Sequence, residues 1–433
     1  MTPATPWLTR RIWRWATFDV ASSTYIAIVP TFFGLYFMSL AGPGGLPAGA
    51  LWGATVALGL VASGILAPIA GAFTDAIACR ACTLRVASYI CVAATILIPW
   101  AADHGLPWAA ALFLVAQTGY TIAASLYDSY LVDIAPAPFR GRASGFGWAL
   151  GMFGGIAVVG IALMMISSVP AAEQTRHLGA IFLMSGIAFG ILAIPALGAL
   201  HGISSPAKFA CWRTEALIAS LRQARATLTG WRAHGNALRA MWAFFLINDA
   251  LVTLQFFIAI VLSARFGLTV EGLLWLSLLF HGSAIPSTIL MGTLADRWGR
   301  RRAIVAMSGA LACAVLLLAF SAASWAPAAA IVPLGLVFAA LQSNFRAMYA
   351  DLVPADQAAE LFGFNAIAGR LSAALGPMIF GFVSALGGTT WALCFLLIPL
   401  AVGVALLLRV RLSSDGTKRV GEDPASVTYR SGV

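Results

Sequence analysis

The sequence predicts an all-α integral membrane protein with about 12 transmembrane helices in two related six-helix bundles. Hydrophobic residues make up 61% of the 433 residues and charged residues only 10%, whereas about a quarter of the residues of a soluble domain are charged. Apolar runs near 20 residues, the length that crosses a hydrocarbon core of about 30 Å, recur along the chain. The second half also repeats the first at a spacing of 218 residues, which indicates a duplicated structural unit.

The apolar runs divide the chain into two halves of six. They cover residues 16–40, 50–73, 84–102, 107–133, 143–167, 177–199, 240–263, 272–295, 302–322, 326–351, 361–386 and 388–408. We therefore expect an N-terminal bundle at 1–199, a linker at 200–239, a C-terminal bundle at 240–411 and a disordered polar tail at 412–433. Leucines spaced for one helical face of the linker suggest an amphipathic helix at the membrane surface, and a plain strut between the bundles is an equal alternative.

The net charge of +10 is distributed in a way that predicts topology rather than nucleic-acid binding. With the N-terminus inside, Arg176 and Arg265 are the only basic residues in predicted outer loops. Arg346 and Arg370 lie within helices, so 22 of the 26 basic residues fall on the inner side. This positive-inside pattern predicts a multi-pass protein of the inner (plasma) membrane with cytoplasmic N- and C-termini.

The cysteines and the N-terminal segment point to no cofactor and no cleaved leader. The six cysteines are scattered over helices and inner loops, which argues against a disulfide framework. Cys79 and Cys82 form a CxxC without a second ligand pair, so incidental spacing is favoured over a zinc or redox site, and no metal is predicted. The first apolar run follows Arg10, Arg11 and Arg14 and is too long for the core of a signal peptide.

Opposite charges occupy equivalent places in the two halves. Within the frame of the repeat, Asp128 falls on Arg346. Ionisable groups are costly in hydrocarbon, so an acid and a base at matched depth suggest a pair or a shared polar site where the halves meet. The aligned identical residues are Ser125 with Ser343, Asp133 with Asp351, Pro136 with Pro354, Ala137 with Ala355, Gly145 with Gly363, Phe146 with Phe364 and Gly151 with Gly369.

The strongest local motif lies between the eighth and ninth predicted helices, from Gly292 to Arg301, and its sequence is GTLADRWGRR. It matches the Gly-x-x-x-Asp-Arg-x-Gly-Arg-Arg signature of the major facilitator superfamily, which the chain therefore resembles. A carboxylate at a helix end accepts hydrogen bonds from a neighbouring helix N-terminus and from arginines, so a gating role is expected. The first-half copy keeps Gly71 and Asp75 but lacks the central arginine and glycine, which suggests unequal gates. The predicted gating residues are Asp75, Asp133, Asp296, Arg297, Arg300, Arg301 and Asp351.

Further motifs narrow the resemblance. They lie at residues 18–25, 127–133, 140–151, 248–249 and 362–377. Together they resemble the facilitator branch that contains the fungal vacuolar amino-acid effluxer linked to autophagy, and its bacterial relatives. Arg370 departs from the pattern of this branch, in which lysine is expected at that position in many relatives. Arginine keeps the positive charge, and its guanidinium group offers a wider fork of hydrogen-bond donors than the lysine ammonium. The resemblance implies a facilitator fold, transport, and amino acids as the first choice of substrate.

In the fold that the chain resembles, the first, fourth, seventh and tenth helices line a central cavity. Each of these helices carries a charged residue here: Asp19, Asp128, Asp249 and Arg346. On the fourth helix Gln117 shares one stripe with Asp128, and on the tenth Gln342 shares one with Arg346. The predicted substrate or coupling residues are Asp19, Gln117, Tyr120, Asp128, Asn248, Asp249, Gln342, Arg346 and Arg370.

Several of these residues have a structural alternative. Asp128 and Arg346 could form an ion pair that holds the halves together, and Asp19 could be solvated or part of a gate, because it lies about one turn from the inner end of its predicted helix. For Asp249, cavity lining or coupling is favoured, because a buried carboxyl that gains and loses a proton can link transport to protons. His281 is interpreted as a packing residue.

The sequence thus predicts a secondary active transporter that works by alternating access between the bundles. A cavity with acidic and basic groups suits a zwitterion, so an amino acid or small peptide is favoured, coupled to protons with sodium as the alternative ion. A transporter of sugars, organic cations or drugs is the alternative of the same class, and a transport-inactive receptor or lipid scramblase that of another class. Neither an enzyme motif nor a P-loop occurs, so no enzyme is expected, and the protein is predicted to work as a monomer.

Overall fold

The computed structural model describes residues 8–41, 47–77, 79–135, 140–200, 235–352 and 373–410. The regular elements in these ranges are helices. The N-terminal half comprises α1 (Arg10–Ile26), α2 (Val29–Leu40), α3 (Ala48–Ile77), α4 (Arg80–Asp103), α5 (Leu106–Ser129), α6 (Leu131–Ile134), α7 (Arg140–Ile166) and α8 (Gln174–Leu200). The C-terminal half comprises α10 (Gly235–Phe266), α11 (Val270–Trp298), α12 (Arg300–Phe320), α13 (Ala326–Leu352), α15 (Leu375–Gly387) and α16 (Thr389–Leu408).

Each of the twelve predicted membrane runs has a helical counterpart among the described residues, which confirms the all-α membrane architecture. Nine spans in this part of the chain are long and apolar enough to cross a bilayer, and the first of them, Arg10–Leu40, comprises both α1 and α2. The helix α10 begins inside the predicted linker, at Gly235. The remaining linker, at 201–234, with its amphipathic-helix prediction, and the tail at 412–433 lie outside the described residues.

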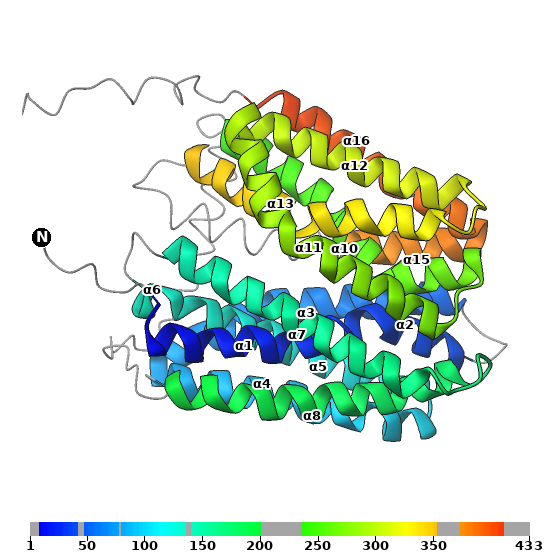
Figure 1. Ribbon diagram of the computed structural model, residues 1–433, viewed down its shortest axis with the longest axis horizontal. Coiled ribbons are helices and arrows are strands. Elements are labelled where there is room, and N and C mark those ends of the chain that lie inside the picture. Colours follow the sequence, from blue (N-terminus) through cyan, green and yellow to red (C-terminus); the bar gives the residue numbers. More distant parts are fainter. Residues whose placement is uncertain are drawn as a thin grey trace, which may run out of the picture.

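The helices form two bundles that lie side by side (Figure 1). In the first, α1 packs against α7 and α8, and α4 packs against α5 and α8. In the second, α13 packs against α11 and α12, and α16 packs against α10 and α12. The bundles meet where α3 contacts α15, α7 contacts α11 and α2 contacts α10. These contacts place α2, α3 and α7 of the first half and α10, α11 and α15 of the second at the boundary between the halves.

The first membrane span is broken, although the sequence predicts one uninterrupted run. The helix α1 ends at Ile26 and α2 begins at Val29. Pro30 has no backbone N–H, so it cannot complete the helical hydrogen bond to the carbonyl of Ile26. Ile28 instead donates its N–H to the carbonyl of Tyr25 at 3.2 Å, a tighter turn. The break exposes irregular backbone near the bundle boundary, a position that membrane proteins tolerate only when it is buried in protein or lines a cavity.

Glycines bring α3 and α15 into direct backbone contact across the boundary. A Cβ atom added to Gly53 would lie 2.3 Å from the carbonyl oxygen of Pro377, and one added to Gly381 would lie 2.3 Å from that of Gly49. Nearby, the fully buried Trp52 donates its indole N–H to the carbonyl of Phe256 on α10 at 3.0 Å. Small residues at helix contacts of this kind replace the hydrophobic driving force that a lipid solvent lacks.

We predict that Gly53→Ala lowers the thermal unfolding temperature of the purified protein. The added methyl group would force α3 away from α15, at a cost of about 1–3 kcal/mol typical of overpacking. Gly160→Ala on α7 is the matched control, because no atom lies within 4 Å of a Cβ placed there, and its higher helix propensity should leave stability unchanged or raised. Equal unfolding temperatures for Gly53→Ala and the wild type would contradict the close contact.

Candidate functional site

A cavity of about 200 Å³ lies between the two bundles. Its walls come from α1, α2, α5 and α7 of the first half and from α10, α11 and α13 of the second. A single water needs only about 10–15 Å³ on this scale, so the cavity has room for a small solute. Most lining residues are apolar. The polar ones are Asp19, Ser22, Ser23, Thr31, Tyr120, Gln255, Ser277 and His281.

Four cavity residues follow the helical repeat of α1. Asp19, Ser22, Ser23 and Ile26 are separated by three, one and three positions, so they lie on one face of that helix. Ala27, at the break, also lines the cavity. The break between α1 and α2 therefore borders the site, as is common for binding sites built from discontinuous membrane helices.

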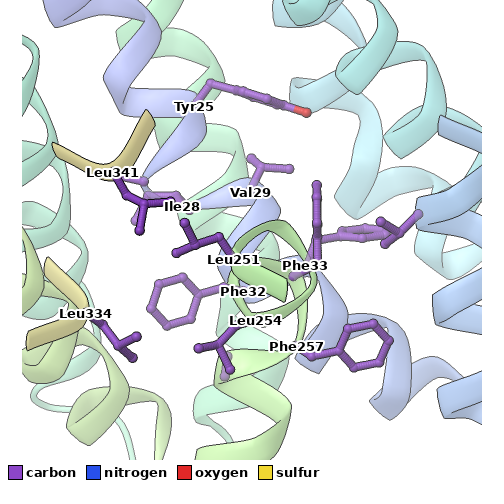
Figure 2. Packing of buried hydrophobic residues seen from close by; sticks show 14 of the residues in the cluster. Tyr25, Ile28, Val29, Phe32, Phe33, Leu251, Leu254, Phe257, Leu334 and Leu341 are labelled. Carbon is purple, nitrogen blue, oxygen red and sulfur yellow. The ribbon is translucent and has the colours of Figure 1, made fainter. Parts of the chain in front are cut away.

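Apolar side chains from both bundles gather where the bundles meet (Figure 2). The ring of Phe32, on α2, lies between Leu254 of α10 and Leu334 of α13. All three are buried and line the cavity. This part of the wall can contact the hydrocarbon portion of a solute, but it offers no hydrogen-bond partner.

The Asp19 carboxylate accepts a hydrogen bond from an aromatic residue of α5. Tyr127 donates its phenol O–H to Asp19 Oδ2 at 2.7 Å. The Tyr127 ring stacks on Trp15 and on Phe18, with 4.6 Å between ring centroids in each case. On the other side, a Cβ atom at Gly147 of α7 would lie 2.2 Å from Asp19 Oδ2. Asp19 lies nine residues after the first residue of α1, Arg10. The prediction that Asp19 lies about one turn from the inner end of its helix is therefore wrong, because the helix begins before the apolar run does.

The other predicted residues of α5 lie in different environments. Tyr120 lines the cavity and stacks on Tyr25 at 5.1 Å. Gln117 is buried outside the lining, where its Oε1 accepts a hydrogen bond from the Tyr25 hydroxyl at 3.1 Å. Asp128 is exposed, lies outside the lining and acts electrostatically on Asp19.

Asp249 is buried but faces away from the cavity. Its Oδ1 accepts a hydrogen bond from the backbone N–H of Gly376, in the first turn of α15, at 3.0 Å. A Cβ atom at Gly376 would lie 2.1 Å from Thr253 Oγ1 and 2.6 Å from either carboxylate oxygen of Asp249. The cavity residues Leu251 and Ile258 lie about 180–200° around α10 from Asp249. Asp249 therefore joins α10 to α15, and its coupling role stays a prediction.

The remaining predicted substrate residues are not brought together in the described structure. Asn248 and Gln342 are half-buried and outside the cavity lining. Arg346 lies on α13, eight residues after the lining residue Phe338, and its side chain is outside the described part. Arg370 lies outside the described residues altogether. The predicted proximity of Asp128 and Arg346 thus stays a prediction.

One predicted gating residue forms an ion pair. Asp133, on α6, accepts a hydrogen bond from Arg80, at the start of α4, with 2.6 Å between Nη1 and Oδ2. The guanidinium also lies over the Tyr130 ring, 4.8 Å from its centroid. Burial raises the pKa of the Tyr130 phenol. The arginine that the motif alignment makes equivalent, Arg301, instead donates to the carbonyl of Val410, after α16, at 3.0 Å.

The other predicted gating residues lie near helix ends. Arg297 is exposed at the end of α11, and Arg300 is half-buried at the start of α12. Asp75, Asp296 and Asp351 lie on α3, α11 and α13, with side chains outside the described part.

Comparisons with known proteins agree with this architecture. Residues 241–429 match the family model of the Major Facilitator Superfamily. The uncharacterized MFS-type transporter YxiO of Bacillus subtilis (strain 168) is 24% identical over 432 residues, which cover 95% of this chain and 97% of that protein. The chain has the major facilitator fold, and its C-terminal half matches the model of that family. It is a transporter rather than an enzyme, embedded in a membrane through many spans.

Solved facilitator structures share the fold over nearly the whole chain. A D-xylose–proton symporter has a TM-score of 0.71 with 14% identity and covers 92% of this facilitator and 97% of its own chain. The nucleoside transporter NupG (D323A mutant) has a TM-score of 0.69 with 14% identity, covering 92% and 98%. A bacterial homolog of the human lysosomal transporter Spinster, inward-facing and unoccupied, has a TM-score of 0.64 with 16% identity, covering 95% and 100%. At these identities the likeness shows the fold alone.

Sequence reasoning missed several features of the site in this facilitator. His281, interpreted as a packing residue, lines the cavity. The only sequence signal for His281 was an ionisable residue inside an apolar helix.

Cys79 and Cys82 are joined by a disulfide at the start of α4, so the expectation that the cysteines stay unpaired is wrong for this pair. Their spacing of three residues places the two side chains on one face of the helix.

We predict that Tyr127→Phe lowers the free energy of unfolding of the facilitator. The change removes the hydrogen bond to Asp19 but keeps the stacking on Trp15 and Phe18, so the loss should be about 0.5–3 kcal/mol, depending on the charge of the carboxyl group. Thermal unfolding of the purified protein measures it. Tyr89→Phe, at an exposed tyrosine on α4, is the control and should unfold like the wild type; equal behaviour of the two variants would argue against the Tyr127–Asp19 bond.

Proposed function

We propose that this facilitator carries a small solute with an amino group and an apolar body, by secondary active transport coupled to protons. Zwitterionic amino acids are the favoured class. One observation supports the proposal above the others. Among the described residues of a cavity to which both bundles contribute, Asp19 is the acidic one, and most of the rest are apolar.

The chemistry of the lining fits an amine better than a sugar. A carboxylate and an ammonium group form short, charge-assisted hydrogen bonds that strengthen when water is excluded. The apolar wall around Phe32, Leu254 and Leu334 suits a hydrocarbon side chain. A sugar would need partners for many hydroxyl groups, and unpaired buried hydroxyls cost free energy.

Asp249 offers a physical route for proton coupling. The ionised carboxylate is stabilised by the N–H of Gly376, at the positive end of α15, whereas the protonated form suits the apolar surroundings. Protonation would therefore weaken the contact between α10 and α15. Since α15 also touches α3 through Gly381 and Gly53, a proton at Asp249 would bias how the two bundles approach each other. Sodium at the same carboxylate is the alternative.

The orientation follows from the basic residues. The arginines of the described residues cluster at one end of the bundles. This end holds the start of α1, the start of α4 and the connection between α11 and α12. By the positive-inside rule this end faces the cytoplasm of a bacterial inner membrane, with both chain termini inside.

An organic cation or drug is the second candidate, because it too would place a positive nitrogen at Asp19 against apolar walls. Reconstituted vesicles, a transmembrane pH gradient and a mixed pool of amino acids, dipeptides, amines and sugars, followed by mass spectrometry, separate the classes. Movement of amino acids supports the proposal, and movement of amines alone supports the second candidate. Movement of sugars, of lipid only, or of nothing under either gradient direction would contradict both.

We predict that Asp19→Asn weakens the apparent affinity for the transported amine by about 10–100-fold. The variant loses a charge-assisted hydrogen bond worth about 1.5–3 kcal/mol, and each 1.4 kcal/mol is about tenfold. Concentration-dependent uptake into vesicles measures the change. Asp103→Asn is the control, because Asp103 is exposed at the end of α4 and far from the cavity lining; it should transport like the wild type.

We predict that Asp249→Asn removes the dependence of transport on the pH gradient. The asparagine keeps a carbonyl oxygen that can accept the Gly376 N–H, so folding should persist, but it cannot gain or lose a proton at neutral pH. Uptake is compared with and without an inwardly acidic gradient. Gradient-driven accumulation that survives the substitution would place the coupling proton elsewhere.

A further inference from the structure

The cavity carries a second ionisable group, contributed by the other bundle. His281 belongs to α11 of the C-terminal bundle, whereas Asp19 belongs to α1 of the N-terminal bundle. Both line the same cavity. The other titratable residue of the described lining is Tyr120, from α5. The parts of α7, α10 and α13 that line the cavity contribute no titratable side chain.

The position of the imidazole fixes which nitrogen is available to a ligand. His281 Nδ1 lies 2.7 Å from the carbonyl oxygen of Ser277, one turn earlier. A carbonyl only accepts hydrogen bonds, so Nδ1 carries a proton and donates. The described residues supply no partner for Nε2. This nitrogen is therefore left to meet a solute or a proton.

A glycine of the other bundle makes room for this edge of the ring. A Cβ atom at Gly155, on α7, would lie 2.6 Å from Cδ2 and 2.8 Å from Nε2 of His281. No larger residue fits while the imidazole keeps its place. His281 therefore lies at the contact of α7 with α11, where the two bundles meet, and a group bound at Nε2 is close to both.

We propose that His281 binds the carboxylate of a zwitterionic solute whose amine lies at Asp19, which rests on the transport function proposed above. The ring takes up one proton at Nε2 from a hydronium ion of the solution, which leaves water, and the resulting imidazolium donates this N–H to the solute carboxylate. The carboxylate and the proton thus enter the site together. Because the two ends of the solute bind to different bundles, a bound zwitterion draws the halves together, whereas an amine without a carboxylate engages only one.

The substitution His281→Asn tests the role of Nε2. Asparagine keeps an N–H near the position of Nδ1, for the Ser277 carbonyl, and lacks any counterpart of Nε2. His104→Asn is the matched control: its Nδ1 contacts the carbonyl of Trp100, also one turn earlier, at 2.9 Å, but the ring is exposed at the far end of α4. Gly155→Ala is a second variant that displaces the imidazole without replacing it, and thermal unfolding shows whether each protein is folded.

Binding of L-leucine and of L-leucinamide is measured by calorimetry at pH 6, where both amines are charged because α-amino groups titrate near about 7.7–8.0. We expect the wild type and His104→Asn to bind leucine at least about tenfold more tightly than leucinamide, from one charge-assisted hydrogen bond. His281→Asn and Gly155→Ala should lose this preference and keep leucinamide binding.

Two failures are distinguishable. An unchanged preference for leucine in His281→Asn and Gly155→Ala would overturn the role of His281 and leave the proposed amine transport standing. Wild-type protein that binds leucinamide as tightly as leucine would also overturn the role of His281 and leave the proposed amine transport standing. Wild-type protein that binds neither compound, although folded, would overturn the proposed function and this inference with it.

Discussion

The cost of an ionisable group in hydrocarbon governs how this facilitator is built. An isolated charge is expensive there, so each carboxylate within the described spans needs a partner that the fold must supply. Asp19 receives the Tyr127 hydroxyl, which is itself held by stacking on Trp15 and Phe18. Asp249 receives a backbone N–H from the first turn of α15. The positions of α5 and α15 relative to their neighbours are thus tied to these two carboxyl groups.

Glycine supplies the close approaches that these polar contacts require. The carboxylate of Asp19 fits against Gly147, Asp249 fits against Gly376, and the ring of His281 fits against Gly155. In each case a single methyl group would occupy the place of the polar atoms. A lipid solvent gives no hydrophobic force between helices, so shape at these contacts carries more of the specificity than it does in a soluble bundle. Three of the candidate functional side chains therefore depend on residues that have no side chain themselves.

Apolar run length and charge asymmetry predicted the architecture because the bilayer imposes both on any chain that crosses it. The residues of the site were harder to predict from the sequence. Asp19 and Tyr120 were predicted to line the cavity and do so, whereas Asp249 shares a helix with cavity residues but faces α15. Helical periodicity says which residues share a face, and only the packing of α10 between its neighbours says which face meets the cavity. His281 was assigned to packing for the same reason.

The two copies of the motif, one in each half, make different contacts. Arg80 and Arg301 are equivalent when the motif from Gly292 to Arg301 is aligned with its first-half copy, yet Arg80 pairs with Asp133 and Arg301 donates to the carbonyl of Val410, after α16. An ion pair exposed to water contributes little, about 0–1 kcal/mol, and is screened by salt, whereas a hydrogen bond to a helix end also gains from the helix dipole. The contacts of the first half are therefore the easier to break.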